Sequence, residues 1–148
     1  MEDDYGDKLN VKNGSDHIKI IFSHNINGET HPCGCRKFPL GGLPQVAGYM
    51  HKASNESSVI YVDTGDMLFQ TPNLPPFYTK SMTYTADEIA KAQDILNLKF
   101  FVPGELDLAL GEDYLANLSK KHKFEFLVSN FKEDIKIKHK AWRSIKVD

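Results

Sequence analysis

The sequence contains only two cysteines and no long apolar run. Two thiols are too few for a disulfide-stabilised scaffold, and a disulfide between Cys33 and Cys35 would be strained because one residue separates them. No apolar run approaches the roughly 18 residues that a membrane helix needs, so we expect no membrane span. The formal net charge is -2, which gives no reason to expect nucleic acid or an anionic membrane as a partner.

The first 16 residues lack the apolar segment of a signal peptide. They are polar and acidic, which predicts a flexible leader before a single domain over residues 17–148. An initiator Met placed before a mature N-terminus would look the same, so the missing signal does not establish a cytoplasmic location. Hydrophobic residues make up 41% of the chain and charged residues 26%, as in ordinary globular domains.

Short β-rich runs alternate with segments of helical periodicity along the chain. The runs predict strands near residues 17–23, 58–63, 99–103 and 124–129. Apolar spacing predicts helices near residues 43–54, 85–97 and 112–121, with Asp87 and Glu88 in the first turn of the second helix. Residues 136–147 alternate between apolar and polar, which predicts a hairpin or an edge pair. The alternating order predicts an α/β fold with a largely parallel sheet flanked by helices.

Three polar segments follow predicted strands: Ser23–Glu29, Asp63–Asp66 and Gly104–Asp107. In open parallel sheets, ligands bind beyond the carboxyl ends of the strands. Gly65 allows a tight turn there, so Asp66 can project into a crevice and bridge two divalent metals. An ordinary strand-to-helix turn with a capping Asp explains the same segment without a metal.

A second candidate site consists of His31, Cys33 and Cys35. These three donors can form part of a thiolate metal site, and the two thiols can serve in redox chemistry or covalent attachment. The alternative is two small residues in a Gly-containing loop, or an intermolecular thiol pair. Four other histidines are interpreted as solvated surface residues: His17, His51, His122 and His139.

Taken together, the ordered segments resemble the N-terminal part of 5′-nucleotidase-type metallophosphoesterases. In that family, T-N-D-x-H-G, Gly-Gly-Leu, D-x-G-D, G-N-H-E/D and S-A-N follow one another. The corresponding segments here are Ser23–Gly28, Gly41-Gly42-Leu43, Asp63–Asp66, Gly104–Asp107 and Ser129-Asn130. Some members also carry Pro-Cys-Gly-Cys after the first motif, as residues 32–35 do here. The resemblance implies the first half of an αββα sandwich, and a periplasmic or extracellular location.

The departures from the family pattern fall on residues that the family uses for metals and catalysis. The resemblance implies that Asn25 and Asn27 replace an Asp and a His ligand, and that Glu105 replaces an Asn ligand. Leu106 replaces the His that stabilises phosphoryl charge, and Leu cannot donate a hydrogen bond. Asp66 is retained. The resemblance therefore implies, at most, weak binding of Mn²⁺, Zn²⁺ or Mg²⁺ by Asp66, Asn25 and Glu105.

Two functions from different classes follow from this resemblance. One is a binding module that kept the fold and lost catalysis, which we favour. The other is part of a metal-dependent phosphohydrolase acting on nucleotides or related phosphate esters, whose further His ligands come from a C-terminal G-H-x-H stretch. The family's second sheet also comes largely from its C-terminal part. The sheet here must then be covered by the chain's own C-terminal segment, by self-association or by a protein partner, and we expect one of the last two.

Overall fold

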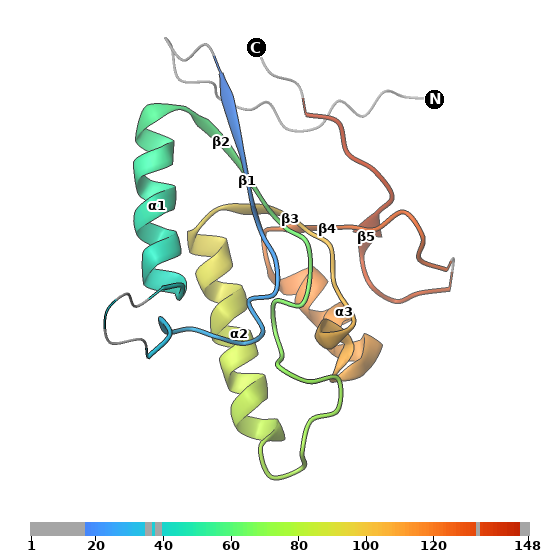
Figure 1. The fold of residues 1–148 in the computed structure, drawn as a ribbon. Coiled ribbons are helices and arrows are strands. Elements are labelled where there is room, and N and C mark those ends of the chain that lie inside the picture. The colour runs from blue at the N-terminus through green and yellow to red at the C-terminus, as the bar shows by residue number, and fades with distance from the viewer. Residues whose placement is uncertain (1–16, 35–36, 38–39, 133, 146–148) are drawn as a thin grey trace, which may run out of the picture.

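The structure is a computed structural model that describes residues 17–34, 37, 40–132 and 134–145. The proposed leader, residues 1–16, lies outside the described residues. Strands and helices alternate along the chain (Figure 1). The elements are β1 (Ile18–Ser23), α1 (Leu43–Glu56), β2 (Ser58–Asp63), α2 (Thr79–Ile95), β3 (Leu98–Phe101), the 3₁₀ turn η1 (Leu106–Leu108), α3 (Gly111–Lys121), β4 (Glu125–Leu127) and β5 (His139–Lys140).

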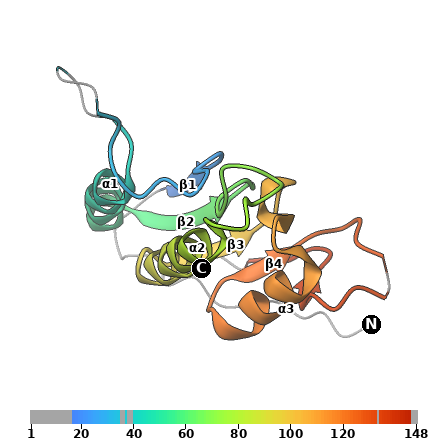
Figure 2. The same ribbon diagram turned by 90° about the horizontal axis from the view of Figure 1, so that it is seen from below.

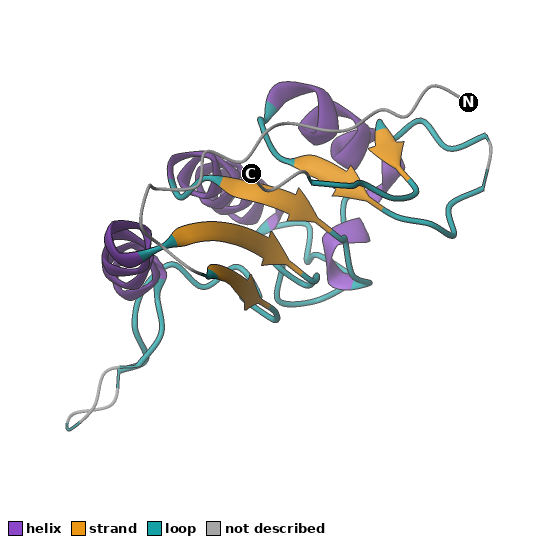
Figure 3. Cartoon of the chain, turned by 90° about the horizontal axis from the view of Figure 1, so that it is seen from above, coloured by secondary structure: helices purple, strands orange, loops and turns teal. Residues whose placement is uncertain are grey.

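The five strands form one sheet in the order β1-β2-β3-β4-β5, and every neighbouring pair is parallel. Figure 3 shows the strand arrows pointing the same way, so their carboxyl ends meet at one edge. The predicted α/β class and the parallel arrangement of the first four strands are therefore confirmed. Of the hairpin or edge pair expected in residues 136–147, the described residues contain an edge strand, because β5 pairs parallel to β4 at the end of the sheet.

Helix α2 begins earlier than the sequence predicts. The N–H groups of Tyr78 and Thr79 donate to the carbonyl of Pro75 and start the helix directly after the proline-rich loop. Asp87 and Glu88 therefore lie beyond the first turn, which contains no acidic residue, and their predicted placement is wrong. The helix therefore starts with these backbone hydrogen bonds to the proline-rich loop, and acidic side chains in its first turn play no part.

All three helices pack on the same side of the sheet (Figure 2). Ala86, Ile89 and Ala90 of α2 are fully buried, and α3 contributes Leu115 and Leu118. These side chains join one core cluster with sheet residues including Tyr61, Leu98, Phe101 and Phe126. The other side of the sheet carries no helix in the described part of the chain. Among all the described residues, no helix is long and apolar enough to cross a membrane.

Candidate functional site

The loop after β1 runs beside the loop after β2 and continues their pairing beyond the strands. The N–H of Thr64 donates to the carbonyl of Ser23 at 2.9 Å, and the N–H of Asn25 donates to the carbonyl of Gly65 at 3.0 Å. Further along, the N–H of Asn27 donates to the carbonyl of Asp66 at 2.8 Å. The sequence candidates Asn25 and Asp66 therefore lie on adjoining loops at the carboxyl edge.

Asn25, Asn27 and Asp66 adopt left-handed backbone conformations. Their φ angles are 54°, 52° and 56°. Asn and Asp tolerate this region better than other residues with a side chain, because their short polar groups can hydrogen-bond locally. The two asparagines at the family's ligand positions are therefore suited to the turn that the backbone makes there. Sequence reasoning weighed them as ligands and missed this conformational role.

A third loop, after β3, packs tightly against the second. A Cβ placed on Gly65 would lie 2.8 Å from the amide nitrogen of Gly104. A Cβ on Gly104 would lie 2.3 Å from Oδ1 of Asp66. Neither position has room for a side chain, so the close approach of the two loops depends on both glycines.

The buried carboxylate of Asp107 holds these two loops together. Its Oδ2 accepts the N–H groups of Asp66 and Gly104, both at 2.8 Å. Its Oδ1 accepts those of Met67 at 2.9 Å and Leu68 at 2.8 Å. Two oxygens offer about four acceptor positions, and all four are used. Burial raises the pKa of Asp107, and the N–H bonds oppose that rise. Asp107 is thus a structural clamp, a role that sequence reasoning did not assign.

The clamp leaves little of the carboxyl edge for metal ligands. Oδ1 of Asp66 accepts the N–H of Leu106 at 2.9 Å, and Glu105 is exposed on the turn before η1. Oδ1 of Asn27 is buried without a hydrogen-bond partner, which leaves one neutral oxygen for a water molecule or a cation. Among the described residues, no group of three or more His, Cys, Asp or Glu side chains could hold a metal ion. These side chains do not fit a two-metal centre.

A second buried carboxyl, Asp63, lies at the end of β2. Ser23 Oγ donates to its Oδ2 at 2.5 Å and also lies 2.9 Å from the hydroxyl of Tyr61. The N–H of Gly65 donates to its Oδ1 at 3.0 Å. Burial raises the pKa of Asp63 to about 6, although the bonds from Ser23 and Gly65 favour the ionised form. Asp63 therefore carries a substantial cost of ionisation near neutral pH.

His31 and Cys33 lie in the loop between β1 and α1. His31 Nδ1 lies 2.8 Å from Oγ1 of Thr30, and the N–H of Leu40 donates to Sγ of Cys33 at 3.3 Å. His31 and Cys33 are both exposed. Cys35 lies outside the described residues, so its proposed part in a thiolate metal site with His31 and Cys33, or in redox chemistry or covalent attachment, stays a prediction.

His122 is not the surface residue that the sequence suggested. Its side chain is only 3% exposed, and Nδ1 lies 2.8 Å from Oδ2 of Asp94. The ring also stacks on Phe124, with centroids 5.5 Å apart. Helix α2 ends just after Asp94, and α3 ends just before His122, so this contact ties together the ends of two helices. The spacing of polar residues along the sequence carries no signal for such a long-range pair.

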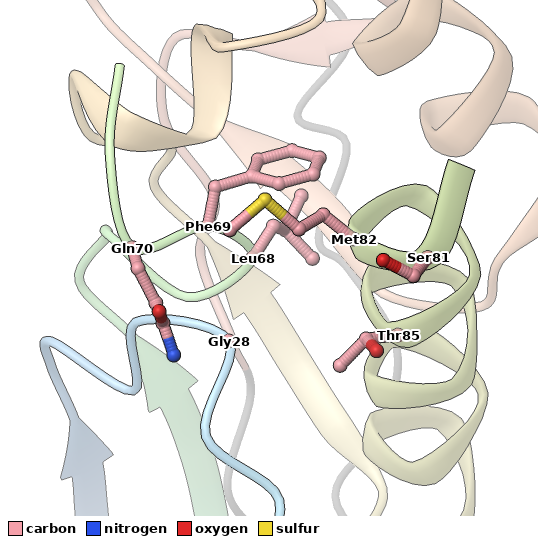
Figure 4. A pocket seen from close by; sticks show the side chains of 7 residues that line it. All are labelled: Gly28, Leu68, Phe69, Gln70, Ser81, Met82 and Thr85. Carbon is pink, nitrogen blue, oxygen red and sulfur yellow. The ribbon is translucent and has the colours of Figure 1, made fainter. Parts of the chain in front are cut away.

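A small pocket lies between the loop after β2 and helix α2 (Figure 4). It has a volume of about 120 Å³, whereas pockets for small-molecule ligands are typically about 300–1,000 Å³. Its lining residues are Gly28, Leu68, Phe69, Gln70, Ser81, Met82 and Thr85. The pocket is too small to enclose a nucleotide.

Solved structures with a similar arrangement include 5′-nucleotidases and a calcineurin-like phosphoesterase. A 5′-nucleotidase precursor from Thermus thermophilus matches with a TM-score of 0.60 and 19% identity, over 75% of this chain and 22% of that one. The calcineurin-like phosphoesterase YfkN from Bacillus subtilis matches with a TM-score of 0.57 and 17% identity, over 73% and 35%. The sulfate thiohydrolase SoxB from Thermus thermophilus matches with a TM-score of 0.60 and 12% identity, over 76% and 30%.

No family model and no curated protein matches the sequence. The chain spans only about a fifth to a third of the length of the solved structures above. At these identities the likeness concerns the fold, and the fold is the one that the ordered motifs predicted. The chain therefore has the α/β fold of the N-terminal part of the 5′-nucleotidase-type and calcineurin-like metallophosphoesterases.

Proposed function

We propose that this chain is a metallophosphoesterase-like module that acts by binding and does not hydrolyse phosphate esters. The observation that carries the proposal is that the carboxylates at the carboxyl edge of the sheet accept hydrogen bonds from the backbone. The carboxylate of Asp107 accepts four backbone N–H groups, and Oδ1 of Asp66 accepts the N–H of Leu106. A two-metal centre needs carboxylate and imidazole groups directed at the ions, and here the carboxylates are directed at the backbone.

The side chain of Leu106 supports the same conclusion. It occupies the position where the resemblance places a charge-stabilising His, and its apolar side chain cannot stabilise a phosphoryl group. Even a metal bound weakly through Asp66 would therefore lack this electrostatic contribution. Because solved structures of this fold include a 5′-nucleotidase precursor, we place the module in the periplasm or outside the cell.

A hydrolysis assay with Asp66→Asn as the matched control tests the proposal. The wild-type chain is assayed with bis-p-nitrophenyl phosphate and AMP in the presence of Mn²⁺, Zn²⁺ or Mg²⁺, while calorimetry measures Mn²⁺ binding. We expect no turnover above that of Asp66→Asn, and no binding of two Mn²⁺ ions. Turnover that depends on the metal and disappears in Asp66→Asn would overturn the proposal.

The short span of the chain favours one second candidate. Because the matched region makes up only 22–35% of the solved structures, a longer polypeptide could supply the missing histidines. The chain would then contribute Asp66, with Asn25 and Glu105, to a phosphohydrolase for nucleotides or related esters. The downstream reading frame separates the two candidates, because codons that continue into a G-H-x-H stretch favour the enzyme and a stop codon favours the binding module.

A further inference from the structure

A cavity of about 320 Å³ lies between the end of α3 and the strands β4 and β5. Figure 2 shows α3 lying beside β4, and the N–H of Lys138 donates to Oγ of Ser119 at 3.0 Å, which ties the segment before β5 to the helix. Pockets for small-molecule ligands are typically about 300–1,000 Å³, so the cavity is large enough for a small ligand. Its lining residues are Ser119, His122, Phe124, Glu125, Phe126, Lys138, His139 and Lys140.

This cavity lies away from the candidate site at the carboxyl edge. His122 and Phe124 come just before β4, and Lys138 comes just before β5, so the cavity lies at the amino ends of these two strands. Asn25 and Asp66, by contrast, lie beyond the carboxyl ends of β1 and β2. Because the strands are parallel, the two places are at opposite edges of the sheet.

His122 gives the cavity a hydrogen-bond acceptor. Its side chain is only 3% exposed, and Nδ1 lies 2.8 Å from Oδ2 of Asp94 on α2. A carboxylate beside Nδ1 favours the tautomer in which that nitrogen carries the hydrogen, so Nε2 on the other side of the ring keeps its lone pair. Nε2 is buried and has no hydrogen-bond partner among the described residues. Buried polar atoms usually have a partner, so this one indicates a missing donor.

Glu125 gives the same cavity a second acceptor. Its Oε1 accepts a hydrogen bond from Nη2 of Arg143 at 3.0 Å, which holds the carboxylate in place. Its Oε2 is buried and has no partner in the part of the chain that the structure describes. Leaving a charged oxygen without a donor costs more than leaving a neutral one. Two acceptors that lack donors line one cavity, and this favours a ligand that carries several N–H groups.

The other lining residues add positive charge and apolar surface. Lys138 and Lys140 are exposed, and a lysine ammonium group donates well to a carboxylate. Phe124 and Phe126 are buried, and their rings stack with centroids 6.0 Å apart. Aromatic rings of this kind pack favourably against apolar or aromatic groups of a ligand. The lining thus combines acceptors, cations and an apolar wall.

We propose that this cavity binds a free α-amino acid. The ammonium group of the ligand donates to Oε2 of Glu125 and Nε2 of His122, and its carboxylate accepts from Lys138. An apolar side chain packs against the rings of Phe124 and Phe126. A zwitterion suits this lining because each of its charges meets a group of opposite sign or a matching acceptor. An anion without an amine would leave both acceptors without a donor, and an amine without an anion would leave the lysine unpaired.

Titration calorimetry of the full 148-residue chain tests the proposal. The probes are L-phenylalanine and L-leucine, together with 3-phenylpropionate, which lacks the amine, and 2-phenylethylamine, which lacks the carboxylate. The test variant Glu125→Gln keeps an oxygen for Arg143 and puts an NH₂ group where the ammonium should bind. The matched control Glu88→Gln makes the same change at another ion-paired glutamate, whose Oε1 lies 2.6 Å from Nζ of Lys91. Lys138→Gln changes an exposed side chain, and circular dichroism checks that all three variants remain folded.

We expect L-phenylalanine or L-leucine to bind the wild type with a dissociation constant of about 0.1–1 mM, as for other small ligands of modest efficiency. Both phenyl analogues should bind at least about tenfold more weakly than L-phenylalanine. Glu125→Gln should weaken amino-acid binding at least about tenfold and Lys138→Gln about threefold, whereas Glu88→Gln should leave it unchanged.

Three results would overturn the proposal: no binding of either amino acid up to about 10 mM, equal binding in Glu125→Gln and Glu88→Gln, or binding of 3-phenylpropionate as tight as that of L-phenylalanine. The last result would show that an anion suffices and that the two acceptors play no part. The inference stands independently of the proposed function, because calorimetry with amino acids reports on the amino ends of β4 and β5 and the hydrolysis assay reports on the carboxyl edge.

Discussion

Replacing Asp63 with Asn should make the protein more stable at neutral pH, even though Asp63 is fully buried and hydrogen-bonded. Asn has nearly the same shape, and its carbonyl oxygen can still accept the N–H of Gly65. Its amide can donate to Ser23 Oγ, whose own hydrogen can turn to the hydroxyl of Tyr61. The substitution therefore removes an ionisable group while preserving its hydrogen bonds.

The size of the effect follows from the pKa of Asp63. Burial raises this pKa from 3.8 to about 6 in the folded chain. Because the folded value is the higher one, folding favours the protonated carboxyl. This contribution to stability is complete below about pH 4 and is lost as the pH rises through 6. By pH 7.5 the wild type has lost about 3 kcal/mol of its free energy of unfolding in this way. The Asp63→Asn variant has no ionisable group at this position and loses none.

Urea unfolding of both proteins at about pH 4.5, 5.5, 6.5 and 7.5 measures the effect. The informative quantity is the difference in the free energy of unfolding between variant and wild type at each pH, because most other titrating groups cancel. About a third of the loss has already occurred at the lowest pH, so we expect this difference to move in favour of Asn by about 2 kcal/mol across the series. A difference that is constant with pH, or that favours Asp at high pH, would show that Asp63 ionises without cost and that this reasoning is wrong.

Three further predictions concern the loops and the first helix. Asp107→Asn should destabilise the fold by about 3 kcal/mol in urea unfolding at neutral pH, because an amide NH₂ would face two buried N–H donors; an unchanged midpoint would contradict the clamp. Gly104→Ala should cost about 2 kcal/mol or more, because its Cβ would meet Asp66 at 2.3 Å, and a neutral result would show that the loops can separate freely. Gly48→Ala, in the exposed interior of α1 with no atom within 4 Å of the new Cβ, should instead stabilise by about 0.5–1 kcal/mol, and a loss of thermal stability would contradict it.

The sequence predicted the strands and helices well where apolar periodicity was strong. The run Val59 to Val62 and the spacing of Leu115 and Leu118 identify a strand and a helix because burial imposes those periods. The start of α2 was missed because its first turns carry exposed side chains such as Tyr84, so no apolar face marks them. The direction of β5 depends on its partner strand rather than on its own residues.

The candidate site was predicted less completely, for a physical reason. The motifs placed three loops at one edge of the sheet, and the backbone contacts between Asn25, Gly65 and Gly104 agree with that placement. The ligand roles of Asn25, Asp66 and Glu105 remain predictions. The sequence could not show that Asp107 is a structural clamp and Asp66 is not, because the difference lies in which carboxylate faces the backbone N–H groups. Such a distinction arises only when segments about 40 residues apart fold together.

The order of the strands in the sheet equals their order in the chain. As a ribosome releases such a chain, each completed strand can add to the strand made just before it, and no strand must later be inserted between two that are already paired. The sheet can thus grow outward in one direction, from the first strand toward the fifth. Among the described residues β1 pairs only with β2, so its other edge faces no described strand. Of the five described strands, residues 18–23 thus present an edge for the longest part of synthesis, and an exposed strand edge can pair with another chain.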